Sequence, residues 1–519
     1  MRSVLDKKCK KNEKCGLWHM IPAPIWYVFL FMGLLTGWGP LSIDNYYQIA
    51  IGKLIVEQGI PHEIPFTVHT AEHLHYMAQQ WLFMVFDYGI YSAFGFAGLF
   101  FCGLLLNMFL VYTVYRMLLH IGKGRRIIAY PAAVLFGMYP FFVRTLCLLR
   151  PYYITCILLA LEIIMMERVR AGGGSKKMLF AFPVLSILSI NFHSAMWPML
   201  FVMLLPYAAE NLCMKVPFMK RFFYGENPVS ARFVIRAALL VFIAGFFNPY
   251  GTEALTYGIR SYGLDILRHY SFEMMPLIYI MPLVLIVAAS MTFNVFLTVR
   301  FHLPLSYVFL SIGTGFMALL SYRSFLLFLM FFMVPTAYLS PLMPSLRLEK
   351  RRKPMVLMIL AALPVYLLGI VRPVSLYYPV QHTLINCAAA FKRDAQEQGI
   401  PAGPLFGYGY SSYFLFRGIP VYFFSSDESF TEKMNGKHDV LQEAMDVSHE
   451  KIPVTFWEHQ YGIHYYMTTR DMKIHDSLLD TPGFTLVYDS DKDLDRFVSK
   501  EHMHIRMYRG PTAGEAEIQ

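Results

Sequence analysis

The chain has 519 residues, of which 56% are hydrophobic and only 15% are charged. Its mean hydropathy is +0.44, and together these values exclude an ordinary water-soluble globular protein. The net charge of +10 could suggest nucleic-acid binding. However, Lys and Arg gather in short clusters between apolar runs, where they orient a membrane protein. We therefore predict an integral membrane protein whose partners include membrane lipids and no nucleic acid.

The N-terminal segment 1–19 is basic and is predicted to lie in the cytoplasm. The apolar run that follows, 20–39, ends at GWGPLSIDNYY without a small-residue cleavage pattern. We expect it to be retained as the first membrane span.

Further apolar runs follow it, several of them short, and each is a candidate to cross about 30 Å of hydrocarbon. They lie near 92–118, 127–142, 151–167, 178–191, 195–210, 233–247, 277–297, 303–321, 324–342 and 354–372. With the first span they predict about eleven transmembrane helices.

The connections between these runs alternate in charge. One set carries basic clusters such as HIGKGRR, ERVRAGGGSKK and LRLEKRRK, and the other carries little positive charge. Cationic loops stay on the cytoplasmic side, so this pattern places the N-terminus inside and everything after 372 outside. We predict a transmembrane domain over 20–372, with long outer loops at 40–91 and 248–276, and an extracytoplasmic domain over 373–519.

The C-terminal segment differs in character from the spans. GPLFGY, PVYFF and FTLVYD read as short strands, while HTLINCAAAFKRDAQEQG and DKDLDRFVSK read as helices. The predicted fold class is therefore an α-helical polytopic membrane protein with a small C-terminal extracytoplasmic α/β domain.

Asp44 is the most informative single residue, because this carboxylate follows immediately after the first span. At the outer interface it could deprotonate an acceptor hydroxyl beside the anomeric carbon of a lipid-linked sugar. The alternative is that Asp44 only caps the helix NYYQIAIGKLIVEQG that follows it.

Several motifs carry a family resemblance in the same order along residues 20 to 450. The first outer loop, with Asp44, YYQIAIGKLIVEQGIP, PFT and QQWL, resembles that of the GT-C glycosyltransferase superfamily. This superfamily includes lipid-linked-sugar mannosyltransferases and oligosaccharyltransferase catalytic subunits. LLRPYYITCILLALEIIMMER, NFHSAMWP, NPYGTEAL, YSFEMMPL and SYRSFLLFLMFFMVP are similar to motifs of a largely uncharacterised bacterial branch.

The resemblance implies a GT-C-like fold and an inverting glycosyltransferase with Asp44 as the base. The sequence departs from the family pattern at three places. Gln80 stands where an acid usually precedes the Trp-Leu pair, Glu63 and Ile64 stand where aspartate commonly precedes Pro-Phe, and Asn45 follows Asp44 in place of a second acid. A metal site built from an acid pair is therefore not supported by these residues.

A polyprenyl-phosphate donor needs cations at the outer interface to bind the phosphate and stabilise it as the leaving group. Few cations are predicted on that side, and the candidates are Arg144, Arg150, Arg323 and His193. Alternatively, the arginines reach lipid headgroups or pair with loop acids, and the histidine belongs to a helix turn.

The remaining candidate site residues come from the two outer loops. Glu273 is a second candidate catalytic acid, with a plain helix-start role as the alternative. Candidate substrate-binding residues are Tyr46, Glu63, Gln80 and Trp81. In the tail, Asp427 and Glu428 either bind an acceptor or cap a turn.

The leading functional prediction is an extracytoplasmic glycosyltransferase that moves a sugar from a polyprenyl-phosphate-linked donor to a cell-envelope glycan, lipid or protein. The alternatives are a non-catalytic GT-C-like scaffold of the cell envelope and, from another class, a transporter of a lipid-linked glycan. No cofactor is indicated with certainty, and the participation of a divalent cation such as Mg²⁺ or Mn²⁺ is left open.

Overall fold

The computed structural model divides the chain into two compact units. It describes residues 42–142, 148–173, 175–222, 228–262, 264–270, 274–342, 383–407, 409–493 and 504–511. Within these ranges, unit 1 contains 103–142 and 150–342, and unit 2 contains 42–102, 148–149 and 383–511. The predicted first span 20–39, the predicted last span 354–372 and the predicted domain boundary at 372 lie outside the described residues.

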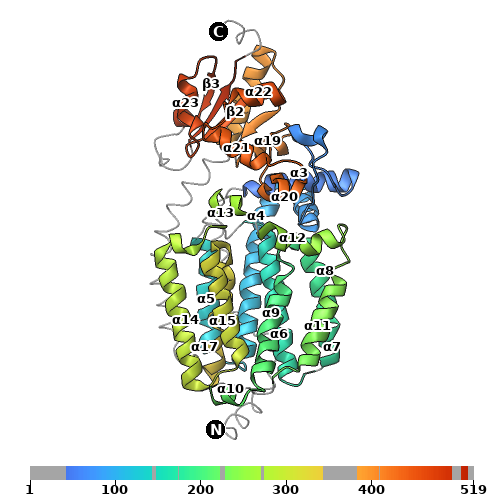
Figure 1. Cartoon of the computed structure of the whole chain (residues 1–519), viewed down its shortest axis with the longest axis vertical. Helices are drawn as coiled ribbons and strands as arrows, with labels where there is room; N and C mark the ends of the chain where they lie inside the picture. Colours follow the sequence, from blue (N-terminus) through green and yellow to red (C-terminus); the bar gives the residue numbers. More distant parts are fainter. Residues whose placement is uncertain are drawn as a thin grey trace. The chain divides into compact units, whose positions relative to one another are not determined.

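Unit 1 is helical, and its longer helices run alongside one another in Figure 1. They are the C-terminal part of α4 (Trp81–Ile121), α5 (Arg126–Phe142), α6 (Pro151–Arg170), α7 (Ser175–Leu179), α8 (Ala181–His193), η2 (Ser194–Met196), α9 (Met199–Cys213), α10 (Pro217–Phe222), α11 (Ala231–Ala244), α12 (Thr252–Tyr262), α13 (Asp265–Tyr270), η4 (Leu277–Tyr279), α14 (Met281–Phe301), α15 (Leu305–Leu320), η5 (Tyr322–Ser324), α16 (Phe325–Phe331), α17 (Val334–Leu339) and η6 (Ser340–Leu342). α6 contacts α8 and α9, α11 contacts the same two helices, and α15 contacts α9, α14 and α16.

Four helical segments in the described part of the chain are long and apolar enough to cross a membrane. They are Trp81–Ile121, Lys177–Met196, Met281–Phe301 and Tyr322–Leu342. Large apolar side chains on several unit 1 helices are exposed, including Phe180, Leu205, Ile235, Leu285, Phe296 and Phe316. Such a surface is expected where helices face lipid. The protein is therefore a membrane protein, as its composition predicted.

The predicted apolar runs between 92 and 342 each coincide with a helix or with consecutive helices. The helical class of this region is thus confirmed. The count of about eleven spans and the orientation of the chain stay predictions.

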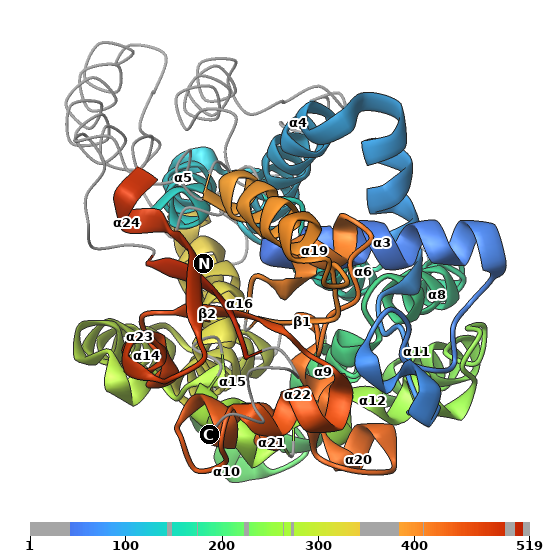
Figure 2. The same cartoon turned by 90° about the horizontal axis from the view of Figure 1, so that it is seen from above.

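Unit 2 combines the first long loop with the C-terminal segment. Its elements are α3 (Ile43–Gln58), η1 (Val68–Glu72), the N-terminal part of α4, α19 (Ser411–Phe416), η8 (Asp427–Phe430), α20 (Glu432–Asn435), α21 (Val440–Ser448), α22 (Thr455–Tyr461), α23 (Ile474–Asp480), α24 (Ser490–Asp493) and four strands, β1 (Leu405–Gly407), β2 (Tyr465–Thr469), β3 (Thr485–Asp489) and β4 (Ile505–Arg509). Residues 383–398 are also helical. Figure 2 shows α19 beside α3, and the two helices are in contact.

The sheet of unit 2 has the strand order β1-β2-β4-β3. β1 pairs with β2 in parallel, with Leu405 opposite Tyr465. β2 and β3 both pair with β4 in antiparallel fashion, and Tyr466 lies opposite Tyr508. The predicted strand PVYFF does not join this sheet, because it forms only isolated bridges from Val421 to Leu405 and Thr67.

Two glycines shape the region where α3 meets α4. A Cβ on Gly52 would lie 2.0 Å from the carbonyl oxygen of Met84. Only glycine therefore allows α3 to approach α4 this closely. Gly95 has a φ of 61° and interrupts α4 with a kink, a conformation that glycine adopts without steric cost.

Candidate functional site

Asp44 lies in the first turn of α3. The Ser42 hydroxyl donates to Asp44 Oδ2 at 3.3 Å, and the Asn45 amide donates to the Ser42 carbonyl at 2.9 Å. A carboxylate is favourable at this end of a helix because the helix dipole is positive there. Asp44 is partly exposed, so its carboxylate can meet a bound molecule.

Asn45 has a different role from its neighbour. Its side-chain amide lies 2.9 Å from Asp87 Oδ2, 3.0 Å from the Leu149 carbonyl oxygen and 3.1 Å from Gln48 Oε1. Asn45 and Asp87 are both buried, where losing one partner would leave a costly unpaired polar group. Asn45 therefore ties α3 to α4 and to the segment 148–149. It holds in place the backbone that carries Asp44.

Gln80 contacts α3 through Tyr47, and its Nε2 donates to the Tyr47 hydroxyl at 2.8 Å. Tyr47 is buried, and its ring stacks on Phe424 at 5.5 Å. Burial raises the pKa of Tyr47 well above its ordinary value, and the negative charges of Asp44 and Glu428 add to that effect. Tyr47 is thus a neutral phenol near Asp44, and Gln80 is its hydrogen-bond donor.

The C-terminal segment adds two carboxylates to this region. Gln79 Nε2 donates to Glu428 Oε1 at 2.5 Å. Burial, followed by the charges of Glu428 and Asp44, raises the pKa of Asp427 to about 7. Asp44, Asp427 and Glu428 are therefore close enough to influence one another, and we call them the acidic site. Each of its members comes from unit 2.

The other predicted substrate-binding residues of unit 2 are placed differently. Tyr46 is buried, and its ring packs against Tyr413 at 5.1 Å and Phe416 at 5.5 Å. Trp81 begins α4 and is partly exposed. Glu63 is exposed and pairs with His73 Nδ1 at 2.8 Å. Tyr46 thus packs inside the unit, whereas Trp81 and Glu63 reach its surface.

Two of the predicted phosphate-binding residues meet in unit 1. Arg323 Nη2 lies 3.4 Å from His193 Nε2, and His193 Nδ1 lies 3.1 Å from the Thr155 hydroxyl. The Tyr152 hydroxyl donates to the Arg323 carbonyl at 3.1 Å, and the Arg323 guanidinium lies 5.9 Å from the Tyr152 ring centroid. Arg323 lies in η5 and His193 in α8, so the two residues meet only in the folded chain. We call Arg323 and His193 the cationic group.

The third arginine, Arg150, is the N-cap residue of α6, two residues before Tyr152. It therefore lies at the same end of α6 as Tyr152, which contacts Arg323. Arg144, predicted to bind phosphate, and Glu273, predicted to be catalytic, lie outside the described residues.

The acidic site does not have the donor set of a closed metal centre. Among the described residues, one group of three His, Cys, Asp or Glu side chains has its ligand atoms within 4.8 Å of one another, and that group is His69, Glu72 and His438. Asp44, Asp427 and Glu428 are not in such a group. The three carboxylates of the acidic site can accept protons and hydrogen bonds.

Sequence reasoning did not identify Tyr47 and Gln79 as parts of this site. Their only local signal is that each is next to a residue of the same type that the sequence analysis does select, Tyr46 and Gln80. It also gave no hint that His69 and His438 are neighbours, because nothing local links residues so far apart in the chain.

Known structures provide a comparison for most of the chain, whereas no protein-family model and no curated protein matches its sequence. One similar structure is an oligosaccharyltransferase from Archaeoglobus fulgidus tethered with an acceptor peptide, with 9% identity and a TM-score of 0.49. Another is the archaeal oligosaccharyltransferase AglB from Archaeoglobus fulgidus in complex with an inhibitory peptide and a dolichol-phosphate, with 11% identity and a TM-score of 0.52. Each alignment covers 86% of this chain and 69% of the other.

At 11% identity the second likeness concerns the fold alone. The predicted GT-C-like architecture is confirmed at that level, while the bacterial branch stays a prediction. The chain therefore shares the fold of an archaeal oligosaccharyltransferase.

Proposed function

We propose that the protein is a membrane glycosyltransferase that uses a polyprenyl-phosphate-linked sugar as donor. Its acceptor would be a glycan, lipid or protein of the cell envelope. The reaction would take place on the outer side of the membrane, with the N-terminus in the cytoplasm and the C-terminal domain 373–519 outside. The fold shared with an oligosaccharyltransferase supports this class of reaction, and the chemistry of the site residues supports the roles below.

The observation that carries the proposal is the accessible Asp44 carboxylate beside Asp427 and Glu428. In the proposed reaction the acceptor nucleophile attacks the anomeric carbon while Asp44 takes its proton. The bond from the anomeric carbon to the phosphate oxygen breaks, and polyprenyl phosphate leaves with the electron pair. One direct displacement inverts the anomeric configuration, as the family resemblance implies.

The leaving phosphate needs positive charge or hydrogen-bond donors. Arg323 and His193 offer both from neighbouring elements. We assign them, with Arg150, to the phosphate of the donor. Arg144 keeps its proposed phosphate role and Glu273 its proposed catalytic role. Trp81 and Glu63 reach the surface of unit 2 and remain proposed substrate contacts.

Replacing Asp44 tests the proposal. Asp44→Asn should lower sugar transfer in vesicles supplied with a lipid-linked sugar by about 100-fold or more, because general-base catalysis contributes about 10²–10⁴-fold. Glu57→Gln is the matched control, since Glu57 lies on the same helix, is exposed and pairs with Lys53 on the helix surface. Full transfer by Asp44→Asn would remove Asp44 as the base.

A non-catalytic scaffold is the second candidate, and one observation favours it. Gln80 stands where the family pattern has an acid, and here it is bound to the buried Tyr47 hydroxyl. A scaffold would bind the lipid phosphate without turnover. Binding of a polyprenyl phosphate that weakens in Arg323→Ala, with no transfer to any envelope acceptor, would favour the scaffold.

A further inference from the structure

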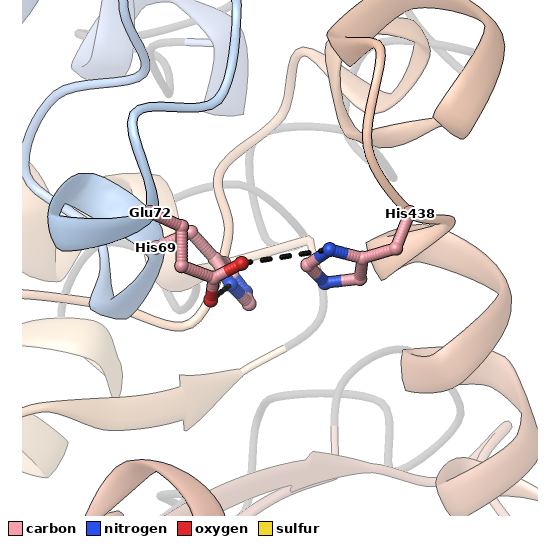
Figure 3. A group of neighbouring side chains, drawn as sticks. All are labelled: His69, Glu72 and His438. Carbon is pink, nitrogen blue, oxygen red and sulfur yellow. Dashed lines mark hydrogen bonds and ion pairs between the residues drawn. The ribbon is translucent and has the colours of Figure 1, made fainter.

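His69, Glu72 and His438 form a compact group in unit 2, although His438 is far from the other two in sequence (Figure 3). His69 and Glu72 are three residues apart in η1, which brings their side chains together, and His69 Nδ1 lies 2.9 Å from Glu72 Oε1. His438 Nδ1 approaches Glu72 Oε2 at 3.5 Å from the other side. The Glu72 carboxylate thus lies between two imidazoles.

The backbone around His438 is fixed by Asn435. The Asn435 side-chain oxygen accepts from the amide of Lys437 at 2.9 Å and from that of His438 at 3.3 Å, and its amide group donates to the His438 carbonyl at 2.8 Å. Lys437 Nζ also donates to the Glu72 carbonyl oxygen. His438 is therefore held near η1 by the side chain of its neighbour Lys437 as well as by its own side chain.

Each of the two histidines has a ring nitrogen that makes no hydrogen bond within the described residues. The His69 side chain is fully buried with 0% exposure. The Nε2 atoms of His69 and His438 are buried and have no hydrogen-bond partner among the described residues. A buried imidazole nitrogen without a partner is costly. The Nδ1 atoms of both rings face the Glu72 carboxylate, so a metal ion at that position would take one nitrogen of each ring as a ligand.

The donor set and its spacing fit a zinc-like ion. Zinc binds imidazole nitrogen and carboxylate oxygen at about 2.0–2.2 Å, which places tetrahedral ligand atoms about 3.4 Å apart. The three ligand atoms here lie within 4.8 Å of one another, so small side-chain rotations would close the site. Glu72 and His438 are 35% and 36% exposed, so an ion can enter.

One side of the group faces open space. Glu72 also lines a cavity of about 570 Å³, together with Thr67, Val68, Pro404, Pro420, Gln460 and Tyr461. A fourth coordination position on this side would be open to water, as in zinc sites with three protein ligands. The ring of Tyr461 packs on His69 at 5.0 Å and separates part of the group from that space.

We propose that His69, Glu72 and His438 bind a zinc-class divalent metal ion that fastens the first long loop to the C-terminal segment. Neither Asp44 nor the cationic group of unit 1 takes part, so the site does not depend on the proposed glycosyl transfer. The ion would join residues 68–72 to residues 435–438, and water would complete its coordination.

Metal content and thermal stability test the proposal on the full chain in detergent. Protein stripped with EDTA, loaded with Zn²⁺ and desalted should retain about one Zn²⁺ per chain, and the ion should raise the melting temperature. His438→Ala should lower the retained zinc about tenfold or more and abolish that rise. His73→Ala is the matched control, because His73 lies in the same loop, is exposed and pairs with Glu63 outside the group.

Glu72→Gln provides a second variant that keeps the size of the side chain if His438→Ala fails to fold. Loading with Co²⁺ gives a further readout, since a tetrahedral site produces strong visible absorption that should vanish in both variants. Equal zinc retention by the wild type and a folded His438 or Glu72 variant would overturn the proposal. So would a wild-type chain that retains no zinc.

Discussion

At the scale of single residues, Asp427 is a group whose charge changes near neutral pH. Its pKa is raised from an ordinary 3.8 to about 7 by burial and by the charges of Glu428 and Asp44. Between these two values the folded protein holds a proton that the unfolded chain has released. Stability therefore falls as the pH rises through this window, because ionisation of Asp427 costs free energy in the folded state only.

Asp427→Asn should remove this cost, since the amide resembles the neutral acid in shape and carries no charge. We expect the variant to gain about 4 kcal/mol of stability relative to the wild type at pH 8, but less than about 2 kcal/mol at pH 5, where the fall in wild-type stability has only begun. Thermal denaturation in detergent at the two pH values measures the difference. The exposed Asp480 offers a control, Asp480→Asn. A gain of equal size at both pH values would contradict the raised pKa.

Single residues also show what the sequence could predict about the site. Asp44 was identifiable because it follows an apolar run, and Arg323 and His193 because each lies at the end of a predicted span. The structure brings the latter two into contact. By contrast, the contact between Gln80 and Tyr47 links residues on two helices, and only the packing of those helices creates it.

At the scale of elements, unit 1 contains a buried charged network that joins three helices. Arg170 of α6 donates to Glu210 of α9 at 2.6 Å and to the Ser306 hydroxyl of α15 at 2.7 Å. Glu167 accepts from the hydroxyls of Tyr207 at 2.9 Å and Tyr307 at 2.5 Å. These charged side chains are buried and paired with one another. They fasten the helices together, which does not favour a transport role.

Removing the central cation should be strongly destabilising. Arg170→Met leaves Glu167 and Glu210 buried without their cation, at an expected cost of about 3–5 kcal/mol. Arg168→Met is the matched control, since Arg168 lies on the same helix and is exposed. Adding Glu167→Gln and Glu210→Gln to Arg170→Met should restore part of the loss. Thermal denaturation of the four proteins measures this, and an unchanged melting temperature for Arg170→Met would show that the network is not stabilising.

Elements also differ in how well the sequence predicts them. Long apolar runs identify helices, and each run predicted between 92 and 342 is helical in the structure. Of the strands, β1 and β3 were predicted, but β2 and β4 were not, because YYMTT and IRMYR have no clear alternation. PVYFF was predicted as a strand and is not one. Its Pro420 has no amide proton to donate to a ladder.

At the scale of the whole molecule, the first long loop and the C-terminal segment belong to one compact unit. Backbone hydrogen bonds join them directly. The Val68 amide donates to the Val421 carbonyl at 3.1 Å, the Val421 amide to the Phe66 carbonyl at 3.2 Å, and the His75 amide to the Asn435 carbonyl at 3.2 Å. The sequence could not reveal this, because pairing between distant segments leaves no local pattern.

From these bonds we predict that the backbone amides of the first long loop are as protected from hydrogen exchange as those of the C-terminal segment. Peptides covering 62–80 should exchange as slowly as those covering 403–424, because opening either requires breaking the shared bonds.

Asn435→Ala removes the side chain that fixes the turn before His438, so it should speed exchange in 62–80 and in 431–438. The exchange rate of peptides from α11 in unit 1 should be the same in this variant as in the wild type. Hydrogen-exchange mass spectrometry of the intact protein measures all four regions. Fast exchange of 62–80 in the wild type, beside a slow 403–424, would mean that the loop opens independently of the segment on which it packs.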